Sequence, residues 1–310
     1  MRNHRAALSA LCLSAALLTG ALCGCSGGDE ARSIRLIADS TEGFYWENLI
    51  AGAQLAADDA GWQLEVVQWD EEVGMQAQID AARQSGVDFL AIAADDAEPR
   101  LPQGYNGSPE VILIGQETGD AATVNITYDS STVGKGVGTL TGSKVGLQKN
   151  YLLVAITETY RFSDRWEDGL RYVLGQQGSR IAQRVNCGDN AERAYSLCLA
   201  ALGSGARCDG IICASENATL GALRAVRALG SDVPIIGAEF NDEIALGLRD
   251  GQVRGTVVHT VYGCAYMAVE NAIRMASGRE TDGKKMLDVL YVDAQNMFDE
   301  ELAPLLYDVK

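Results

Sequence analysis

The most informative shortage in this sequence of 310 residues is histidine, of which there are only two. Once a leader segment ending at residue 24 is set aside, His259 is the single histidine left. A Ser-His-Asp or Cys-His catalytic group would have to be built around that residue, and a Cys/His zinc site would lack ligands. The sequence also has no CxxC pair, no GxxxxGK[ST] phosphate loop and no GxSxG nucleophile turn. These shortages argue against an enzyme, and we expect no metal or other cofactor.

Basic residues are scarce as well. The chain has 25 Lys and Arg against 42 Asp and Glu, which gives a formal net charge of −17. A surface of that sign repels a phosphate backbone, so we exclude nucleic acid as a partner.

Long apolar runs are limited to one, at the amino terminus. Arg2 and Arg5 precede an apolar stretch over residues 6–22. That stretch is shorter than the roughly 20 residues of a comfortable membrane span. It therefore predicts a signal peptide over residues 1–24 rather than a transmembrane helix.

The end of the apolar run predicts an anchor. Leu22-Cys23-Gly24-Cys25 resembles the bacterial lipobox, and this resemblance implies that Cys25 is lipidated and becomes the new amino terminus. The alternative is an ordinary cleavable signal with incidental cysteines. Residues 25–33 are typical of a flexible tether. We therefore expect an exported chain, held by lipid at the outer face of the cell membrane or in the periplasm.

Beyond the tether, short β-rich runs alternate with amphipathic helical runs, as in parallel sheets covered by helices on both faces. Helical spacing over 46–60 and 219–229 ends at Gly61 and Gly230. We therefore predict an α/β protein of two doubly wound parallel-sheet lobes. Ligands of such sheets bind at the carboxyl ends of the strands. The expected strands cover residues 34–38, 64–68, 89–93, 111–114, 123–126, 152–156, 181–185, 210–213, 235–237, 255–258 and 289–292.

Two segments interrupt this pattern. Residues 99–109 are rich in proline and glycine and are expected to form a loop. Gly134-Lys135-Gly136-Val137-Gly138 imitates a nucleotide-binding loop, but the GxGxxG spacing fails. We interpret it as the beginning of a helix with small residues.

Several short motifs follow one another in an order that is specific as a set. The first are Ile34-Arg35-Leu36-Ile37-Ala38-Asp39-Ser40 and Phe44-Tyr45-Trp46. The later ones are Asp129-Ser130, Ser163-Asp164-Arg165-Trp166, Cys213-Ala214-Ser215-Glu216, Pro234-Ile235-Ile236-Gly237 and Asp250-Gly251-Gln252-Val253-Arg254-Gly255. In these motifs the sequence resembles the ribose/galactose-type periplasmic sugar-binding proteins of ABC importers, which have the type I periplasmic-binding-protein fold. The resemblance covers residues 34–310.

This resemblance implies two lobes joined by a three-strand hinge that close over a ligand. The N-terminal lobe would comprise residues 34–128 and 260–288, and the C-terminal lobe residues 129–259 and 289–310. The implied partners are a sugar-like small molecule and an ABC permease that recognises the loaded form. The protein would meet the membrane only through its lipid anchor.

The resemblance also implies a set of ligand contacts. Tyr45 and Trp46 match an aromatic pair whose faces lie against a sugar ring. Ser215, Glu239 and His259 stand where the family has Asn, Asp and Gln after successive strands. We expect the Glu239 carboxylate to provide much of the polar recognition.

Other positions depart from the family pattern. The family's Asp-Arg pair, which clamps sugar hydroxyls, falls on Gly115 and Gln116, so that clamp is missing. The family's cleft arginine falls on Trp166, with Arg165 one residue earlier, and the sequence leaves open which of them faces the ligand. The remaining candidates are two loop carboxylates, Asp39 and Asp189.

Structural alternatives stay open for these positions. The aromatic pair fits the start of a helix, Trp166 fits a helix core position and His259 fits a hinge residue bonded to backbone. Loop carboxylates such as Asp39 and Asp189 are commonly only solvated.

Five cysteines follow the tether, which is an odd number: Cys187, Cys198, Cys208, Cys213 and Cys264. An oxidising location permits pairing. In this kind of fold a helix end lies beside the start of the next strand, so we predict a disulfide between Cys198 and Cys208. The other cysteines are expected to be structural.

Three other classes of protein share the predicted architecture. A repressor would need a basic helix-turn-helix of about 60 residues before the first strand, and residues 26–33 leave no room for it. A sensor that presents its ligand to a membrane kinase or chemoreceptor would have the same sequence features. An enzyme on this fold is the remaining alternative.

Overall fold

The computed structural model describes residues 32–70, 72–93, 107, 109–115, 124–156 and 161–307. The predicted signal peptide, Cys25 and the candidate contact Gln116 lie outside these residues, as does nearly all of the expected loop over 99–109.

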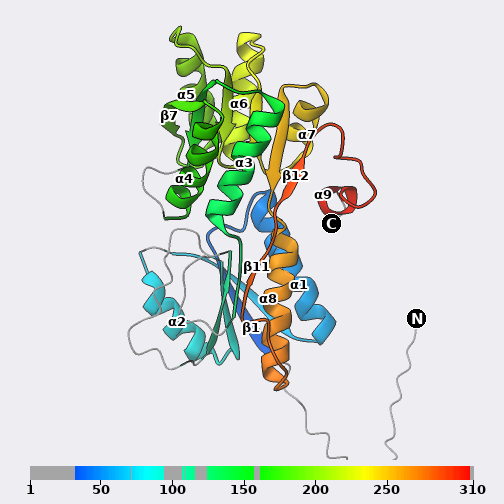
Figure 1. Ribbon diagram of the computed structural model, residues 1–310. Helices are drawn as coiled ribbons and strands as arrows, with labels where there is room; N and C mark the ends of the chain where they lie inside the picture. The colour runs from blue at the N-terminus through cyan, green and yellow to red at the C-terminus, as the bar shows by residue number, and fades with distance from the viewer. Residues whose placement is uncertain are drawn as a thin grey trace, which may run out of the picture. The chain divides into compact units, whose positions relative to one another are not determined.

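The N-terminal lobe is built on a six-stranded parallel sheet with the order β11-β5-β4-β3-β1-β2 (Figure 1). Leu36 and Ile37, adjacent in β1, belong to two different apolar clusters because neighbouring strand residues point to opposite faces. This is why the central strands are continuous apolar runs. The strands are β1 (Ser33–Ala38), β2 (Gln63–Gln68), β3 (Phe89–Ala93), β4 (Glu110–Ile114), β5 (Val124–Thr127) and β11 (Lys284–Met286).

The C-terminal lobe repeats this arrangement with the strand order β12-β10-β9-β8-β6-β7. The strands of the two sheets follow one another in the same relative order, but β12 runs antiparallel to its neighbour β10. The predicted α/β fold of two doubly wound lobes is therefore confirmed. The strands are β6 (Asn150–Ala155), β7 (Arg180–Asn186), β8 (Gly210–Cys213), β9 (Ile235–Ala238), β10 (Val253–Val258) and β12 (Leu290–Val292).

The helices cover the faces of each sheet (Figure 1). In the N-terminal lobe, α1 (Phe44–Ala60) packs beside α8 (Val261–Ala276), and α2 (Gly74–Ser85) adds Ile79 and Ala82 to the cluster on the other face. The pairs in the C-terminal lobe are α3 with α4 and α5 with α6. The remaining helices are α3 (Ser130–Lys144), α4 (Arg161–Gln176), α5 (Ala191–Gly203), α6 (Glu216–Leu229), α7 (Asp242–Arg249) and α9 (Ala303–Tyr307).

The chain passes between the two sheets three times. It leaves the first sheet after β5 and enters α3, returns through the segment between β10 and α8, and leaves again between β11 and β12. As a result, α3, which follows β5 of the first sheet, packs in the C-terminal lobe. Likewise α8, which follows β10 of the second sheet, packs in the N-terminal lobe.

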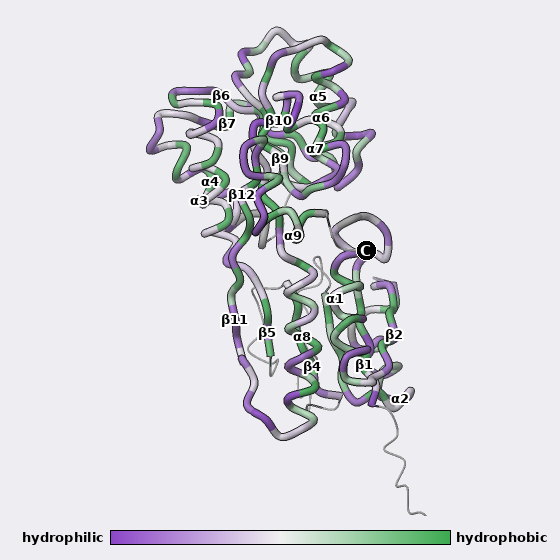
Figure 2. The backbone as a smooth tube through the Cα atoms, turned by 90° about the vertical axis from the view of Figure 1, so that its right-hand side faces the viewer, coloured by the Kyte–Doolittle hydropathy of each residue, from purple (hydrophilic) through white to green (hydrophobic). Residues whose placement is uncertain are grey.

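The eleven predicted strands are all present, with ends displaced by two residues or fewer. The sequence did not predict β11, because Lys284-Lys285-Met286 has no apolar run. Figure 2 shows this edge strand as hydrophilic. Gly61 and Gly230 end α1 and α6 as predicted, with left-handed φ values of 69° and 57°.

The glycine-rich segment that imitates a nucleotide loop lies inside α3 and serves helix packing. A Cβ atom on Gly134 would lie 1.9 Å from the backbone oxygen of Trp166 in α4. A Cβ atom on Gly169 of α4 would lie 2.3 Å from the backbone oxygen of Ser131. The two helices therefore approach more closely than any larger side chain allows.

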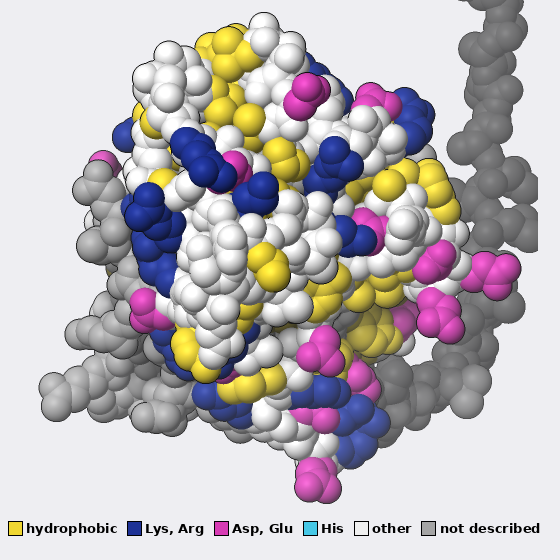
Figure 3. Space-filling view, turned by 45° about the horizontal axis from the view of Figure 1, so that its top comes forward, with side chains coloured by type: hydrophobic (Ala, Val, Ile, Leu, Met, Phe, Trp, Pro, Cys, Tyr) yellow, Lys and Arg dark blue, Asp and Glu magenta, His cyan; other side chains and the backbone are white. Residues whose placement is uncertain are grey.

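The C-terminal lobe pairs several of its surface charges. Arg224 of α6 bonds to Glu192 of α5, and Arg227 bonds to Glu243 of α7 at 3.3 Å. Figure 3 shows basic and acidic side chains interspersed over the outer end of this lobe. Opposite charges therefore partly balance each other on this face.

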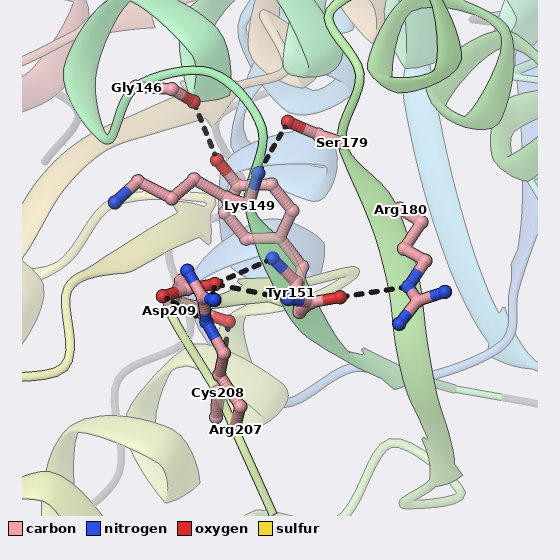
Figure 4. A network of polar contacts seen from close by, with 10 residues as sticks. Gly146, Lys149, Tyr151, Ser179, Arg180, Arg207, Cys208 and Asp209 are labelled. Carbon is pink, nitrogen blue, oxygen red and sulfur yellow. Dashed lines mark hydrogen bonds and ion pairs between the residues drawn. The ribbon is translucent and has the colours of Figure 1, made fainter.

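A polar network joins the amino ends of β6, β7 and β8 (Figure 4). The backbone N–H of Asn150 donates to Asp209 Oδ2 at 2.8 Å, and Arg180 Nε donates to Asn150 Oδ1 at 2.8 Å. The hydroxyl of Tyr151 donates to the Gly146 carbonyl at 3.0 Å, and burial raises the pKa of Tyr151 to about 12. The network fixes the end of the sheet that is opposite to the carboxyl ends of its strands.

The five described cysteines are present as free thiols. The structure therefore does not contain the expected Cys198–Cys208 bond, and the pairing stays a prediction for the exported protein. Burial raises the pKa of Cys198 to about 12, and nearby Cys187 and Cys208 raise it further in smaller measure. Cys187, Cys198 and Cys208 therefore lie in one region of the C-terminal lobe.

Candidate ligand site at the carboxyl ends of the strands

The aromatic pair lies in the first turn of α1, directly after the loop that follows β1. Tyr45 and Trp46 are both half-buried, with ring centroids 5.0 Å apart and an interplanar angle of 75°. This edge-to-face arrangement fixes both rings relative to each other. The pair gives the N-terminal lobe a rigid apolar surface at the carboxyl end of its sheet.

Glu239 follows β9 in an unusual backbone conformation. Its φ is 61°, a left-handed value that costs a residue with a side chain about 1–3 kcal/mol. Two hydrogen bonds hold it there: its N–H donates to the Val257 carbonyl at 2.8 Å, and Thr256 Oγ1 donates to its carbonyl at 2.7 Å. Only 7% of the residue is exposed. The surrounding strands therefore force this carboxylate into the end of the sheet.

His259, at the crossing after β10, binds that carboxylate. Its Nδ1 lies 2.5 Å from Glu239 Oε1, and its backbone N–H donates to Glu239 Oε2 at 3.3 Å. The ring makes T-shaped contacts with two tyrosines, with centroid distances of 4.9 Å to Tyr128 and 6.5 Å to Tyr45. The structure thus brings together Tyr45, Glu239 and His259 from three separate segments.

Ser215 and Asp189 form a second group after β8 and β7. The Ser215 hydroxyl donates to Asp189 Oδ1 at 2.6 Å and accepts the Ala218 N–H at 3.2 Å, as the N-cap of α6. Asp189 also has a positive φ, of 47°. Glu239 and Asp189 are two of the three non-glycine residues with positive φ in the described part of the chain. Left-handed backbone at both positions is the kind of strain that marks functional sites.

Glu216 was not predicted as a site residue. Its Oε1 accepts a hydrogen bond from Asn241 Nδ2 at 2.6 Å. Burial raises the pKa of the Glu216 carboxyl; the Asn241 bond lowers it, and the neighbouring carboxylates Glu239, Asp189 and Glu47 raise it further. Its position directly after Ser215 could have indicated a site residue. The sequence does not show, however, which of these two adjacent side chains faces the site.

The structure does not gather all of the predicted contacts. Trp166 is 7% exposed and packs in the hydrophobic core, which agrees with its structural alternative. Arg165 is exposed, and its Nη2 lies 3.9 Å from Asp129 Oδ2. Asp39 is half-buried after β1, and its carbonyl accepts a hydrogen bond from Gln68 at 3.2 Å.

Two other features are absent from the described residues. These residues contain no group of three or more His, Cys, Asp or Glu side chains arranged to hold a metal ion. No helix in the described part of the chain is both long enough and apolar enough to cross a membrane.

Comparison with known families assigns this architecture to one of them. The model of the periplasmic binding protein domain matches residues 34–280. The chain therefore belongs to the periplasmic-binding-protein family, as its sequence motifs suggested.

Solved structures share the fold over nearly their whole length. An ABC transporter solute-binding protein from Agrobacterium vitis, solved with bound D-fucose, has a TM-score of 0.80 at 19% identity and covers 89% of this chain and 100% of its own. The periplasmic component of a sugar transport system from Hahella chejuensis has a TM-score of 0.75 at 24% identity, covering 84% and 99%. The XylFII-LytSN complex has a TM-score of 0.76 at 20% identity, covering 86% and 99%.

Proposed function

We propose that this protein is an extracytoplasmic solute-binding lipoprotein, without catalytic activity, that delivers a sugar-like molecule to an ABC import permease. The observation that carries the proposal is the meeting of Tyr45, Glu239 and His259 at the carboxyl ends of the strands. An aromatic wall beside a buried hydrogen-bonding carboxylate suits a molecule that has both apolar C–H faces and polar hydrogens. The Agrobacterium vitis protein solved with D-fucose supports a sugar-like class.

Within this proposal the two lobes close over the solute. The N-terminal lobe takes residues 34–128 and 260–288, and the C-terminal lobe residues 129–259 and 289–310. The three segments that link the sheets would then be the hinge, and His259 stands in one of them. Closure makes the loaded form distinct in shape, which is what a permease has to recognise.

The test is a thermal-shift screen of the purified exported protein against sugars and polyols. A solute present at 100 times its dissociation constant adds about 2.7 kcal/mol to the free energy of unfolding, so a true ligand raises the melting temperature clearly. Hits are then titrated calorimetrically. A library without a hit, or a hit that the protein hydrolyses, contradicts the proposal.

A second candidate function, the sensor, is supported by one observation. A similar structure is a complex of XylFII with LytSN, so a protein of this fold does associate with another protein. The alternative is that the present chain offers its bound solute to a membrane kinase or chemoreceptor. Capture of partners from cells with and without the solute separates it from transport.

The anchor is a separate part of the proposal, because Cys25 lies outside the described residues. Changing Cys25→Ser should prevent lipidation, so that the protein either keeps its signal segment or is released in soluble form. Cells that express the parent or the variant are fractionated, and each protein is weighed by mass spectrometry. Equal amounts in the membrane pellet with no lipid on either protein would show that Cys25 is not an anchor.

A further inference from the structure

The proposed site contains three carboxylates that lack lysine or arginine partners among the described residues. Asp189, Glu216 and Glu239 follow β7, β8 and β9 of the same sheet. Their hydrogen-bond partners are Ser215, Asn241 and His259, respectively. Over the described residues, none of the three carboxylates forms an ion pair with a lysine or an arginine. Among the described residues, His259 is the one group with a cationic form that bonds to any of these carboxylates.

Burial makes this imbalance costly for Glu239 and Glu216, whereas Asp189 is exposed to solvent. Glu239 is 7% exposed, and Glu216 is within electrostatic reach of Glu239, Asp189 and Glu47, the last from α1 in the opposite lobe. Carboxylates removed from water are stable only when a cation or several hydrogen bonds compensate them. Gly115, at the end of β4, has no side chain to provide such compensation. A positive charge on the solute would compensate these carboxylates.

The aromatic pair is an independent feature that favours the same kind of ligand. The ring faces of Tyr45 and Trp46 attract C–H groups, and they also attract cations, because the face of an aromatic ring carries negative charge. The fold and this aromatic pair locate the ligand site. The carboxylates indicate only which chemical groups a ligand needs in order to bind there. A sugar ring with an ammonium group satisfies both features.

We propose that the solute carries a positively charged amino group, as an amino sugar does, and that Glu216 and Glu239 bind that group. This inference rests on the proposed solute-binding function. An ammonium group offers three donors, so it can bond to more than one carboxylate at once. Its charge would also favour the ionised form of Glu216, so that binding near the pKa of this group releases protons.

The experiment titrates the exported protein with matched pairs: D-glucosamine against D-glucose, and D-galactosamine against D-galactose, with N-acetyl-D-glucosamine as an uncharged control. At least one amine should bind about tenfold or more tightly than its neutral partner, since charge-assisted hydrogen bonds are about twice as strong as neutral ones. Titration of that amine in two buffers with different ionisation heats should reveal proton release.

The variant Glu216→Gln should lose most of this preference while keeping the fold, as judged by circular dichroism. Glu192→Gln removes an exposed carboxylate of the same lobe that pairs with Arg224, and it should leave the preference unchanged. If Glu216→Gln does not fold, the preference of the parent protein for the amine over its neutral partner still decides.

Two outcomes overturn the inference and leave the proposed function standing. One is a neutral sugar that binds as tightly as its amine, and the other is a neutral sugar from the screen that binds when none of the amines does. If no sugar of either kind binds, the proposed function itself fails.

Discussion

At the scale of single residues, Glu239 is the side chain on which the proposed site depends most. Its carboxylate accepts hydrogen bonds from both the ring and the backbone of His259. Glu239→Gln keeps the size but places an amide where a carboxylate accepts, and an unsatisfied buried group costs about 1–3 kcal/mol. We expect affinity for the solute to fall about tenfold or more by calorimetric titration. The control Glu243→Gln alters a carboxylate of the same lobe whose side chain is 43% exposed, and this variant should bind like the parent.

Trp46→Ala should weaken binding by a similar factor, because it removes apolar contact area from the opposite lobe. Trp62, which stacks on Phe89 at 5.5 Å, provides the contrast. Trp62→Ala should lower the melting temperature and leave the affinity near that of the parent. Affinities within twofold of the parent for both Glu239→Gln and Trp46→Ala would mean that the site is placed wrongly.

At the scale of elements, helix α3 begins at a cap that responds to pH. Asp129 Oδ1 accepts the Thr132 N–H at 2.6 Å, and the bonds from Thr132 lower the pKa of the Asp129 carboxyl. The unfolded chain then binds more protons than the folded one near pH 4, so this stabilisation is present above pH 4 or so and is lost as the pH falls through the lowered pKa. Asp129→Ala should lower the free energy of unfolding at pH 7 by about 0.5–2 kcal/mol.

Denaturant unfolding of the parent, Asp129→Ala and Asp129→Asn between pH 3 and pH 7 checks this expectation. Asparagine keeps a capping oxygen without the charge, so this variant should stay near the parent at pH 7 and lose less stability in acid. If Asp129→Ala matches the parent at pH 7, the cap does not stabilise the helix.

The contact between α3 and α4 gives a second prediction at this scale. Gly134→Ala would place a methyl group 1.9 Å from the Trp166 oxygen, so the helices would have to move apart. We expect a loss of several kcal/mol, at the high end for a single substitution. Gly175 of α4 has open space around it, and Gly175→Ala should leave stability unchanged or raise it by up to about 1 kcal/mol. Equal melting temperatures for the two variants would contradict the packing argument.

Most elements could be predicted because their signals are local. The buried strands are apolar runs. Gly61 and Gly230 end helices because glycine adopts the left-handed conformation easily, which is a property of the residue alone. The strand β11 escaped prediction because its place depends on pairing with β5, more than 150 residues earlier in the chain. The packing role of Gly134 was hidden for the same reason, since the partner helix decides it.

The candidate site could be predicted in part. The resemblance to the sugar-binding family pointed to Glu239 and His259, and the structure joins these two side chains. The sequence does not fix which way a helical side chain turns, so Trp166 remained ambiguous until its packing in the core was seen. Glu216 was overlooked because its environment comes from carboxylates on other segments.

At the scale of the whole molecule, the two sheets have matching strand orders and exchange a helix after their last central strand. This exchange makes the linking segments part of both lobes. Under the proposed function, a solute held between the lobes would act on the segment that contains His259. Binding and change of shape are coupled in such an arrangement by the contacts of a few residues.

The most direct test of this account is the crystal structure of the protein in complex with the solute found by screening. We predict that the solute lies between the two lobes, against the rings of Tyr45 and Trp46. A polar hydrogen of the solute should be bonded to the Glu239 carboxylate, at a heavy-atom distance of roughly 2.6–3.2 Å. A solute bound on the outer surface of one lobe, away from these three side chains, would contradict the account.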